Sequence, residues 1–264
     1  MISSISNQQM KDIIKLQKQL KYRRAASLFI AEGFKMLKEA AEKGCLVKIY
    51  ISESVLEKKH ESLEWLCKEF PCETVSDKVF QQLSDTVTTQ GILGIVKQPS
   101  YNIADILEDR RHMWLLLDGI RDPGNLGTVM RTAEGAGMSA VIMGKGTVDL
   151  FNPKTVRSTM GAIFRMPFVY VDDIVEIITR IKDNGYCVYG TAMKGSIAYD
   201  RADYTKGAGI VIGNEANGIQ GRVLECITAS IHIPMEGKLE SLNAAVAAAV
   251  VMYEAARQRH TKVL

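Results

Sequence analysis

The sequence predicts an α/β protein of two domains, the second and larger of which is built on a parallel sheet. Short apolar runs alternate with helical patterns along most of the 264 residues, as in parallel strands joined by crossover helices. In the second half of the chain, the apolar runs end in loops rich in glycine, asparagine and charged residues. Such loops follow the carboxyl ends of strands, where α/β sheets bind their ligands.

The alternation in residues 1–98 predicts a small α/β sandwich. "SLFIAEGFKMLKEAAEKG" indicates a short strand and then a helix, and "LVKIYIS", "ETVS" and "QGILGIVKQP" indicate three more strands. Helices are expected at 61–70 and 77–83. Residues 1–24 are predicted to form a basic N-terminal helix, and residues 99–111 a linker, because this stretch is polar and begins with Pro99.

The second predicted domain spans residues 112–264, and its strands are expected at 113–117, 140–143, 167–171, 186–191, 209–213 and 230–233. Helices should lie between them, notably at 174–184, and a long helix at 242–258 should end the chain. That last helix is nearly apolar all round through Tyr253, so it is expected to be buried.

Composition places the chain among ordinary globular proteins, with 47% hydrophobic residues, 24% charged residues and a net charge of +3. The N-terminus lacks the apolar core of a signal peptide, and the apolar run 244–253 is half of the ~20 residues that span a bilayer. We therefore expect a cytoplasmic protein with no membrane partner. Five cysteines without a C-x-x-C pair and four scattered histidines give no metal-ligand spacing, so no metal is expected.

The charge is uneven near the N-terminus, where six basic residues and one acid lie between residues 11 and 24. Two interpretations remain open: a solvated helix face or a contact with nucleic acid. The candidates for nucleic-acid contact are Lys18, Lys21, Arg23 and Arg24.

The stretch "LDGIRDPGNLGTVMRTAEGAG", residues 117–137, follows a predicted buried strand and leads into a helix. The glycines of the loop 118–127, at 119, 124 and 127, do not fit G-x-G-x-x-G, and no G-K-[ST] follows, which argues against a dinucleotide dehydrogenase and an NTPase. Asn125 is expected to be the N-cap of the helix after the turn at Pro123. Taken alone, the loop is an ordinary strand-to-helix connection, with Arg131 on the helix surface.

Two later loops have the same character. In "GIVIGNEANGI" a strand ends at Gly213, where the missing side chain permits close approach of a ligand or of neighbouring backbone. In "IHIPMEGKLESLNAAVAAAV" another strand ends before Met235, and Asn243 opens the last helix. Three such loops at one edge of a parallel sheet point to a binding site.

The stretches "DPGNLGTVMRTAEGAG", "VIGNEANGI" and "IPMEGKLESLNAAVAAAVVMYE" resemble, in order and spacing, the three motifs of SpoU (TrmH-type) RNA 2′-O-ribose methyltransferases of the SPOUT superfamily. The resemblance covers residues 112–259. "FIAEGFKMLKEA" and "TTQGILGIV" are similar to the L30e-like substrate-binding domain that precedes the catalytic domain in many members. The second motif departs from the pattern of many members, with Asn214 and Ala216 in place of serine and glycine, which affects the expected pocket wall.

The resemblance implies a homodimeric enzyme that uses S-adenosylmethionine, bound in a deep trefoil knot of the SPOUT-type sheet. The cofactor-binding positions that it implies are Thr191, Gly213, Ile233, Met235 and Leu242. The active-site positions are Asn125, Arg131, Glu215, Ser241 and Asn243.

The substrate implied by the resemblance is RNA, with 23S ribosomal RNA favoured over transfer RNA, because the L30e-like domain is common among ribosomal members. Two alternatives stay open: a transfer-RNA 2′-O-methyltransferase, and an inactive RNA-binding ribosome-assembly factor of the same fold. Base methylation is disfavoured, because the Asn125 and Arg131 pair belongs to the ribose branch.

Overall fold

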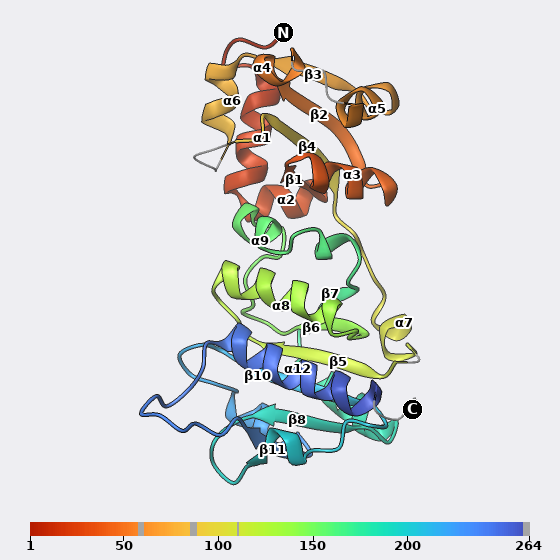
Figure 1. The fold of residues 1–264 in the computed structure, drawn as a ribbon, viewed down its shortest axis with the longest axis vertical. Helices are drawn as coiled ribbons and strands as arrows, with labels where there is room; N and C mark the ends of the chain where they lie inside the picture. The colour runs from red at the N-terminus through yellow and green to blue at the C-terminus, as the bar shows by residue number, and fades with distance from the viewer. Residues whose placement is uncertain (58–60, 85–88, 110, 261–264) are drawn as a thin grey trace. The chain divides into compact units, whose positions relative to one another are not determined.

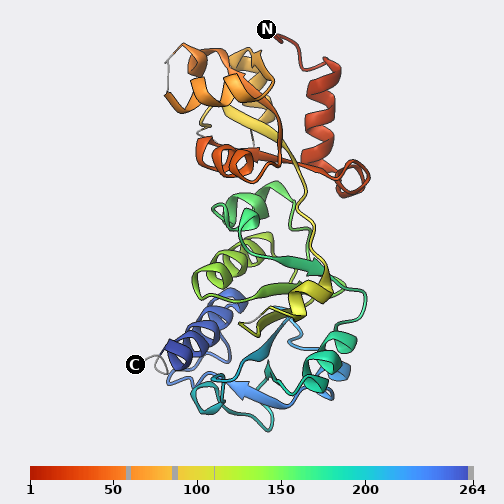
Figure 2. The same cartoon turned by 90° about the vertical axis from the view of Figure 1, so that its right-hand side faces the viewer.

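The computed structural model describes residues 1–57, 61–84, 89–109 and 111–260. The chain forms two compact units (Figures 1 and 2). The first contains Met1–Pro99 together with Asp149–Phe164, and the second contains Ser100–Val148 together with Arg165–Leu264.

The first unit is built on a four-stranded sheet in the order β1-β4-β2-β3. β4 (Ile92–Lys97) runs antiparallel to both β1 (Leu28–Glu32) and β2 (Leu46–Ser52), and β3 (Cys72–Val75) pairs with β2 in parallel. These are the four strands expected from the sequence.

Helices cover both faces of this sheet (Figure 1). α1 (Gln8–Lys18) and α6 (Asp77–Leu83) bury Ile13 and Phe80 against Leu93 of β4. Successive strand residues point to opposite faces, so the next residue, Gly94, faces the other side, where Leu37 of α3 (Phe34–Glu42) packs on it. α5 (Glu61–Glu69) contacts α3, and the short α4 (Glu53–Leu56) follows β2.

The N-terminal segment differs from the single basic helix that was predicted. The chain breaks at Gln19, whose extended backbone separates α1 from a second helix, α2 (Leu20–Ala26). α1 is amphipathic rather than solvated, because Met10, Ile13 and Leu16 are buried in the core.

The segment Asp149–Phe164 groups with the first unit, although the sequence analysis assigned it to the second domain. It carries α9 (Pro153–Ser158) and a short 3-10 helix, η1 (Ala162–Phe164). The ring of Phe29 in β1 lies 5.1 Å from that of Phe151 and 6.2 Å from that of Phe164. Pattern reasoning missed this association because these contacts join residues more than 100 positions apart.

The prediction that Arg23 contacts nucleic acid is wrong. Its side chain is 3% exposed, its Nε donates to Oδ2 of Asp149 (2.7 Å), and Nη2 lies 2.6 Å from the same oxygen. Nη1 donates to the carbonyl oxygens of Leu16 (2.7 Å) and Gln17 (2.9 Å), which end α1. The guanidinium is therefore used inside the protein, whereas Lys18, Lys21 and Arg24 are exposed.

The second unit is built on a seven-stranded, wholly parallel sheet in the order β7-β6-β5-β10-β8-β11-β9. The strands are β5 (Met113–Asp118), β6 (Ala140–Met143), β7 (Phe168–Tyr170), β8 (Cys187–Thr191), β9 (Ile197–Ala198), β10 (Ala208–Gly213) and β11 (Ala229–His232). The six predicted strands are confirmed. β9 was missed because two residues give no periodic signal. The knot remains a prediction.

Helices lie on both faces of this sheet, as a buried parallel sheet requires (Figure 2). α10 (Ile174–Asp183) and α11 (Gly221–Leu224) cover one face, whose core includes Trp114 and Val211. α8 (Pro123–Gly135) and α12 (Ala244–His260) pack together on the other, and a short 3-10 helix, η2 (Tyr199–Arg201), contacts α12.

The predicted linker is not extended throughout. It contains α7 (Ile103–Leu107), whose Ile106 and Leu107 are buried in the core of the second unit. The indole Nε1 of Trp114 donates to the carbonyl oxygen of Ile106 (2.9 Å). The sequence analysis missed this short helix because polar residues surround its apolar positions.

We expect Arg23→Met to lower the free energy of unfolding of the first unit by about 3–5 kcal/mol, because the change leaves the nearly buried Asp149 carboxylate without its cation. Hydrogen exchange should quicken in α1, α2 and α9 above all. Arg24→Met is the matched control, and this exposed residue should change stability by less than ~0.5 kcal/mol. Equal effects of the two substitutions would contradict the structural role of Arg23.

Candidate functional site

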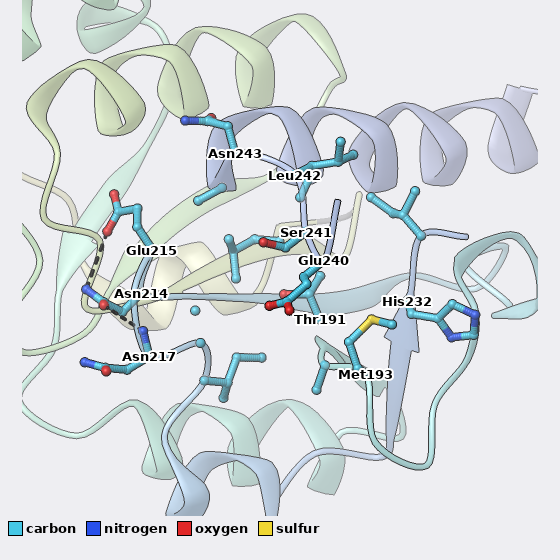
Figure 3. Close-up of a pocket in the computed structure, with 18 of the residues that line it drawn as sticks. Thr191, Met193, Asn214, Glu215, Asn217, His232, Glu240, Ser241, Leu242 and Asn243 are labelled. Atoms are coloured by element: carbon cyan, nitrogen blue, oxygen red, sulfur yellow. Dashed lines mark hydrogen bonds between the residues drawn. The ribbon is translucent and has the colours of Figure 1, made fainter. Parts of the chain in front are cut away.

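A pocket of about 540 Å³ lies at the carboxyl ends of β8, β10 and β11 and at the start of α12 (Figure 3). Ligand pockets commonly have volumes of ~300–1,000 Å³. All five predicted cofactor-binding residues line it, namely Thr191, Gly213, Ile233, Met235 and Leu242. The adjacent strands place these residues together, because parallel strands end at one edge of the sheet.

The three loops singled out in the sequence are joined by a chain of side-chain hydrogen bonds. Nδ2 of Asn243 donates to Oδ1 of Asn125 (3.0 Å), and Nδ2 of Asn125 donates to Oε1 of Glu215 (2.9 Å). These residues lie 118 and 90 positions apart in the sequence. Both ends of the Asn125 amide are thus fixed, and its orientation is determined by its neighbours.

Glu215 is the centre of this network. Its carboxylate also accepts from the backbone N–H groups of Arg121 and Asp122 (both 3.2 Å) and from Nδ2 of Asn214 (3.4 Å). Burial raises the pKa of Glu215, but the hydrogen bonds from Asn125 and from the backbone outweigh it, so the pKa lies below its usual value. The carboxylate is therefore ionised at neutral pH and poorly suited to act as a base.

The helix that carries Asn125 begins earlier than predicted. Asp122 is its N-cap, with Oδ1 accepting from the backbone N–H of Asn125 (2.7 Å), and Pro123 is its first residue. The assignment of Asn125 as N-cap was wrong, because an aspartate stood three residues before it. Since Asp122 caps the helix, the side chain of Asn125 is available for the network.

Asn243 does cap its helix. Its Oδ1 accepts from the backbone N–H groups of Ala245 (2.9 Å) and Val246 (3.3 Å). The same side chain therefore starts α12 with its oxygen and orients Asn125 with its nitrogen.

Gly213 lines the pocket and also allows the loop after β10 to close. A Cβ at this position would lie 2.2 Å from the carbonyl carbon of Gly218 and 2.3 Å from the nitrogen of Ile219. The loop closes here, with paired backbone hydrogen bonds between Asn214 and Gly218 (both 2.9 Å). Of the two explanations open from the sequence, close approach of neighbouring backbone is the one that the structure supports.

Asn214, which departs from the motif of many SpoU-type members, stabilises the same loop. Its Nδ2 donates to the carbonyl oxygen of Gly119 (2.8 Å), and its Oδ1 accepts from the backbone N–H groups of Ala216 (3.0 Å) and Asn217 (3.2 Å). The asparagine therefore holds the loop after β10 against the loop after β5.

Arg131 and Asn125, both on α8, do not line the pocket, whereas the other three predicted active-site residues do. Ser241 lines the pocket beside Leu242 and Asn243. Arg131 lies on the exposed surface of α8, does not line the pocket, and forms no ion pair or hydrogen bond through its side chain with any described residue. Within one chain, its guanidinium is free to meet an anion from outside.

Sequence reasoning missed four polar or flexible residues of the pocket: Met193, Asn217, His232 and Glu240 (Figure 3). His232 is the last residue of β11, and its Nδ1 lies 2.8 Å from Oγ of Ser196. Glu240 directly precedes Ser241 in the third motif, so that position could have been found. Met193 follows a strand end without a recognisable pattern.

The pocket is chemically suited to S-adenosylmethionine. Ile212, Ile219 and Leu242 offer apolar walls to an adenine ring, and the carboxylate of Glu240 offers a partner to a cation. No three His, Cys, Asp or Glu side chains gather as metal ligands would among the described residues. In the same part of the chain, no helix has the length and apolar character needed to cross a membrane.

Comparisons with known proteins agree with this geometry. Residues 112–253 match the SpoU rRNA Methylase family, and residues 7–94 match the MRM3-like substrate binding domain. The 23S rRNA (guanosine(2553)-2'-O)-methyltransferase RlmP of Bacillus subtilis is 34% identical over 96% of this chain and 97% of its own length.

Two solved structures are similar along nearly the whole chain. The AdoMet-bound rRNA methyltransferase from Sinorhizobium meliloti superposes with a TM-score of 0.85, at 31% identity and 97% coverage of both chains. The SpoU methyltransferase AviRb from Streptomyces viridochromogenes, with AdoMet, has a TM-score of 0.88 over 97% of this chain and 99% of its own. At 24% identity, the latter supports the fold alone.

Substitutions at Asn243 can separate helix capping from orientation of Asn125. Asn243→Ala should cost about 1 kcal/mol of stability, whereas Asn243→Ser keeps a capping oxygen and should cost less than ~0.5 kcal/mol. Both should slow methyl transfer about 3- to 10-fold, which corresponds to one net hydrogen bond. Parental activity in Asn243→Ser would show that the bond to Asn125 is dispensable.

Proposed function

Because the chain belongs to the SpoU rRNA methylase family, we propose that it transfers a methyl group from S-adenosylmethionine to a ribose 2′-hydroxyl of 23S ribosomal RNA. The observation that carries the proposal is the network from Asn243 through Asn125 to Glu215, at the edge of a cofactor-sized pocket. The likeness to RlmP over both parts of the chain supports ribosomal RNA as the substrate. Action on ribosomal RNA supports a cytoplasmic location, which we include in the proposal.

The cofactor, when bound, supplies a methyl group activated by the positive charge of its sulfonium. The chain's own residues position the attacking hydroxyl. Asn125 is held rigid by Glu215 and Asn243, so a docking ribose meets a polar group that needs no reorganisation. Positioning of this kind lowers reaction barriers by up to ~7–11 kcal/mol in favourable systems.

Arg131 is the residue that we propose to bind the RNA phosphate and orient the ribose hydroxyl. Its free, exposed guanidinium supports this role. Arginine stays protonated at neutral pH, so it acts as a planar donor rather than as a base.

We expect Arg131→Ala to lower the single-turnover rate of methyl transfer at least ~100-fold, with little change in affinity for S-adenosylmethionine. Arg131→Lys should restore little, because one ammonium cannot replace a planar fork of donors. The rate is measured at saturating RNA and cofactor. A rate within threefold of the parent would remove Arg131 from the mechanism.

The first unit is proposed to capture the RNA, in keeping with the match of residues 7–94 to a substrate-binding domain. Lys18, Lys21 and Arg24 are the candidate phosphate contacts, and Arg23 is left out because it is buried.

Reversing the charges of Lys18, Lys21 and Arg24 together should reduce the slope of log affinity against log salt by about 2–3, because each phosphate contact contributes ~0.7–0.9. The matched control reverses three other exposed lysines of the same unit, Lys43, Lys68 and Lys78. If the slope decreases equally in both triple variants, RNA affinity depends only on net charge and the three residues form no specific contact.

We propose that the enzyme acts as a homodimer joined through α12. This helix was expected to be buried on all sides, but Val246 is 48% exposed and Tyr253 54% exposed in the single chain. Both belong to the helix that packs beside α8, which carries Arg131. A second copy on this face would cover the apolar side chains.

The experiment that tests the activity is transfer of labelled methyl groups to total RNA from a host lacking the gene, followed by mapping of the modified nucleotide. Guanosine 2553 of 23S rRNA, on which RlmP acts, is the first position to examine. Label in transfer RNA would identify the alternative substrate. Cofactor binding without any transfer would instead support an inactive assembly factor.

A further inference from the structure

Three titratable side chains line the pocket: Glu215, His232 and Glu240. Neither lysine nor arginine is among the described residues that line it. A positively charged ligand in this pocket would therefore meet carboxylates and an imidazole, and which of them is available depends on their existing partners.

Two of the three are already engaged. The carboxylate of Glu215 accepts four hydrogen bonds that hold the loops after β5 and β10. Nδ1 of His232 contacts Ser196, whose hydroxyl is 2.7 Å from the carbonyl oxygen of Met193 and donates to it. Since the single hydroxyl proton goes to Met193, the ring donates to Ser196, and His232 serves to hold the turn that carries Met193.

Glu240 differs from both. Its side chain forms no ion pair or hydrogen bond with any residue that the structure describes, and it is exposed to solvent. Figure 3 shows the carboxylate directed into the pocket, between the end that holds Asn214 and Glu215 and the end that holds Met193 and His232. Among the described residues that line the pocket, Glu240 thus carries a carboxylate that no hydrogen bond engages, near the middle of the pocket.

We propose that Glu240 is the anionic partner of the cofactor's sulfonium and that it selects the methyl donor over the demethylated product. The inference rests on the proposed function. The proposal places the adenosine along the apolar wall and the sulfonium, with the methyl group bonded to it, in the middle of the pocket, where Figure 3 shows the Glu240 carboxylate. The sulfonium is a fixed charge, and a facing carboxylate attracts it without hydrogen-bond geometry.

The reaction removes the positive charge of the cofactor, so the attraction to Glu240 differs between donor and product. Methyl transfer converts the sulfonium to a neutral thioether, so S-adenosylhomocysteine lacks the charge that Glu240 attracts. Donor and product otherwise share the same adenosine and amino-acid groups. Glu240 therefore favours exchange of product for fresh donor.

The test measures binding of S-adenosylmethionine, S-adenosylhomocysteine and sinefungin by calorimetry, to the parent and to Glu240→Gln. Sinefungin carries a charged amine in place of the methylated sulfur. We expect Glu240→Gln to weaken the binding of S-adenosylmethionine and of sinefungin at least about fivefold. This factor corresponds to the attraction between two unit charges ~4 Å apart in water. Affinity for S-adenosylhomocysteine should change less than twofold.

The matched control is Glu236→Gln, an exposed glutamate of the same segment that does not line the pocket and should leave all three affinities unchanged. Equal weakening of all three ligands by Glu240→Gln would place their common α-ammonium opposite the carboxylate and overturn the proposal. Unchanged affinities would overturn it as well. If the parent protein binds none of the ligands, it is the proposed function that fails.

Discussion

The carboxylate of Glu215 accepts hydrogen bonds from two backbone N–H groups and from the side chains of Asn125 and Asn214, and the rest of the site depends on this interaction. It fixes the start of α8 to the end of β10, and through Asn125 it reaches the cap of α12. Three loops that approach from different strands are thereby held in one geometry. These hydrogen bonds keep the pKa of Glu215 below its usual value, so we propose that this carboxylate positions other residues rather than acting as a base.

A nearly buried ion pair has a comparable role in the first unit. Asp149 follows β6 in the chain, yet it receives Arg23, which also satisfies the last carbonyl groups of α1. A buried arginine without its carboxylate would be strongly destabilising, so the association of α2 with the segment Asp149–Phe164 is specific. The chain enters this segment from the second unit at Val148 and returns to the second unit at Arg165. The two units are therefore joined by the backbone at both ends of the segment as well as after Pro99.

The charges of the pocket divide between structure and ligand. Glu215 and His232 hold loops in place, whereas Glu240 and Arg131 have no partner among the described residues. One is an anion suited to a cationic cofactor, and the other is a cation suited to an anionic nucleic acid. In the proposed mechanism, the cofactor and the RNA therefore meet opposite charges.

By itself, the sequence determined the alternation of strands and helices, the parallel sheet and the order of the three motifs, because hydrophobic period and turn residues act over a few neighbouring positions. It also identified eight residues that line the pocket. The tertiary structure alone decided that Arg23 is buried, that Asp149–Phe164 joins the first unit and that Gly213 faces the backbone of Gly218. It alone left Glu240 without a partner in the pocket. Each of these depends on contacts between residues that the local pattern does not relate, and on which charges find a partner when the chain packs.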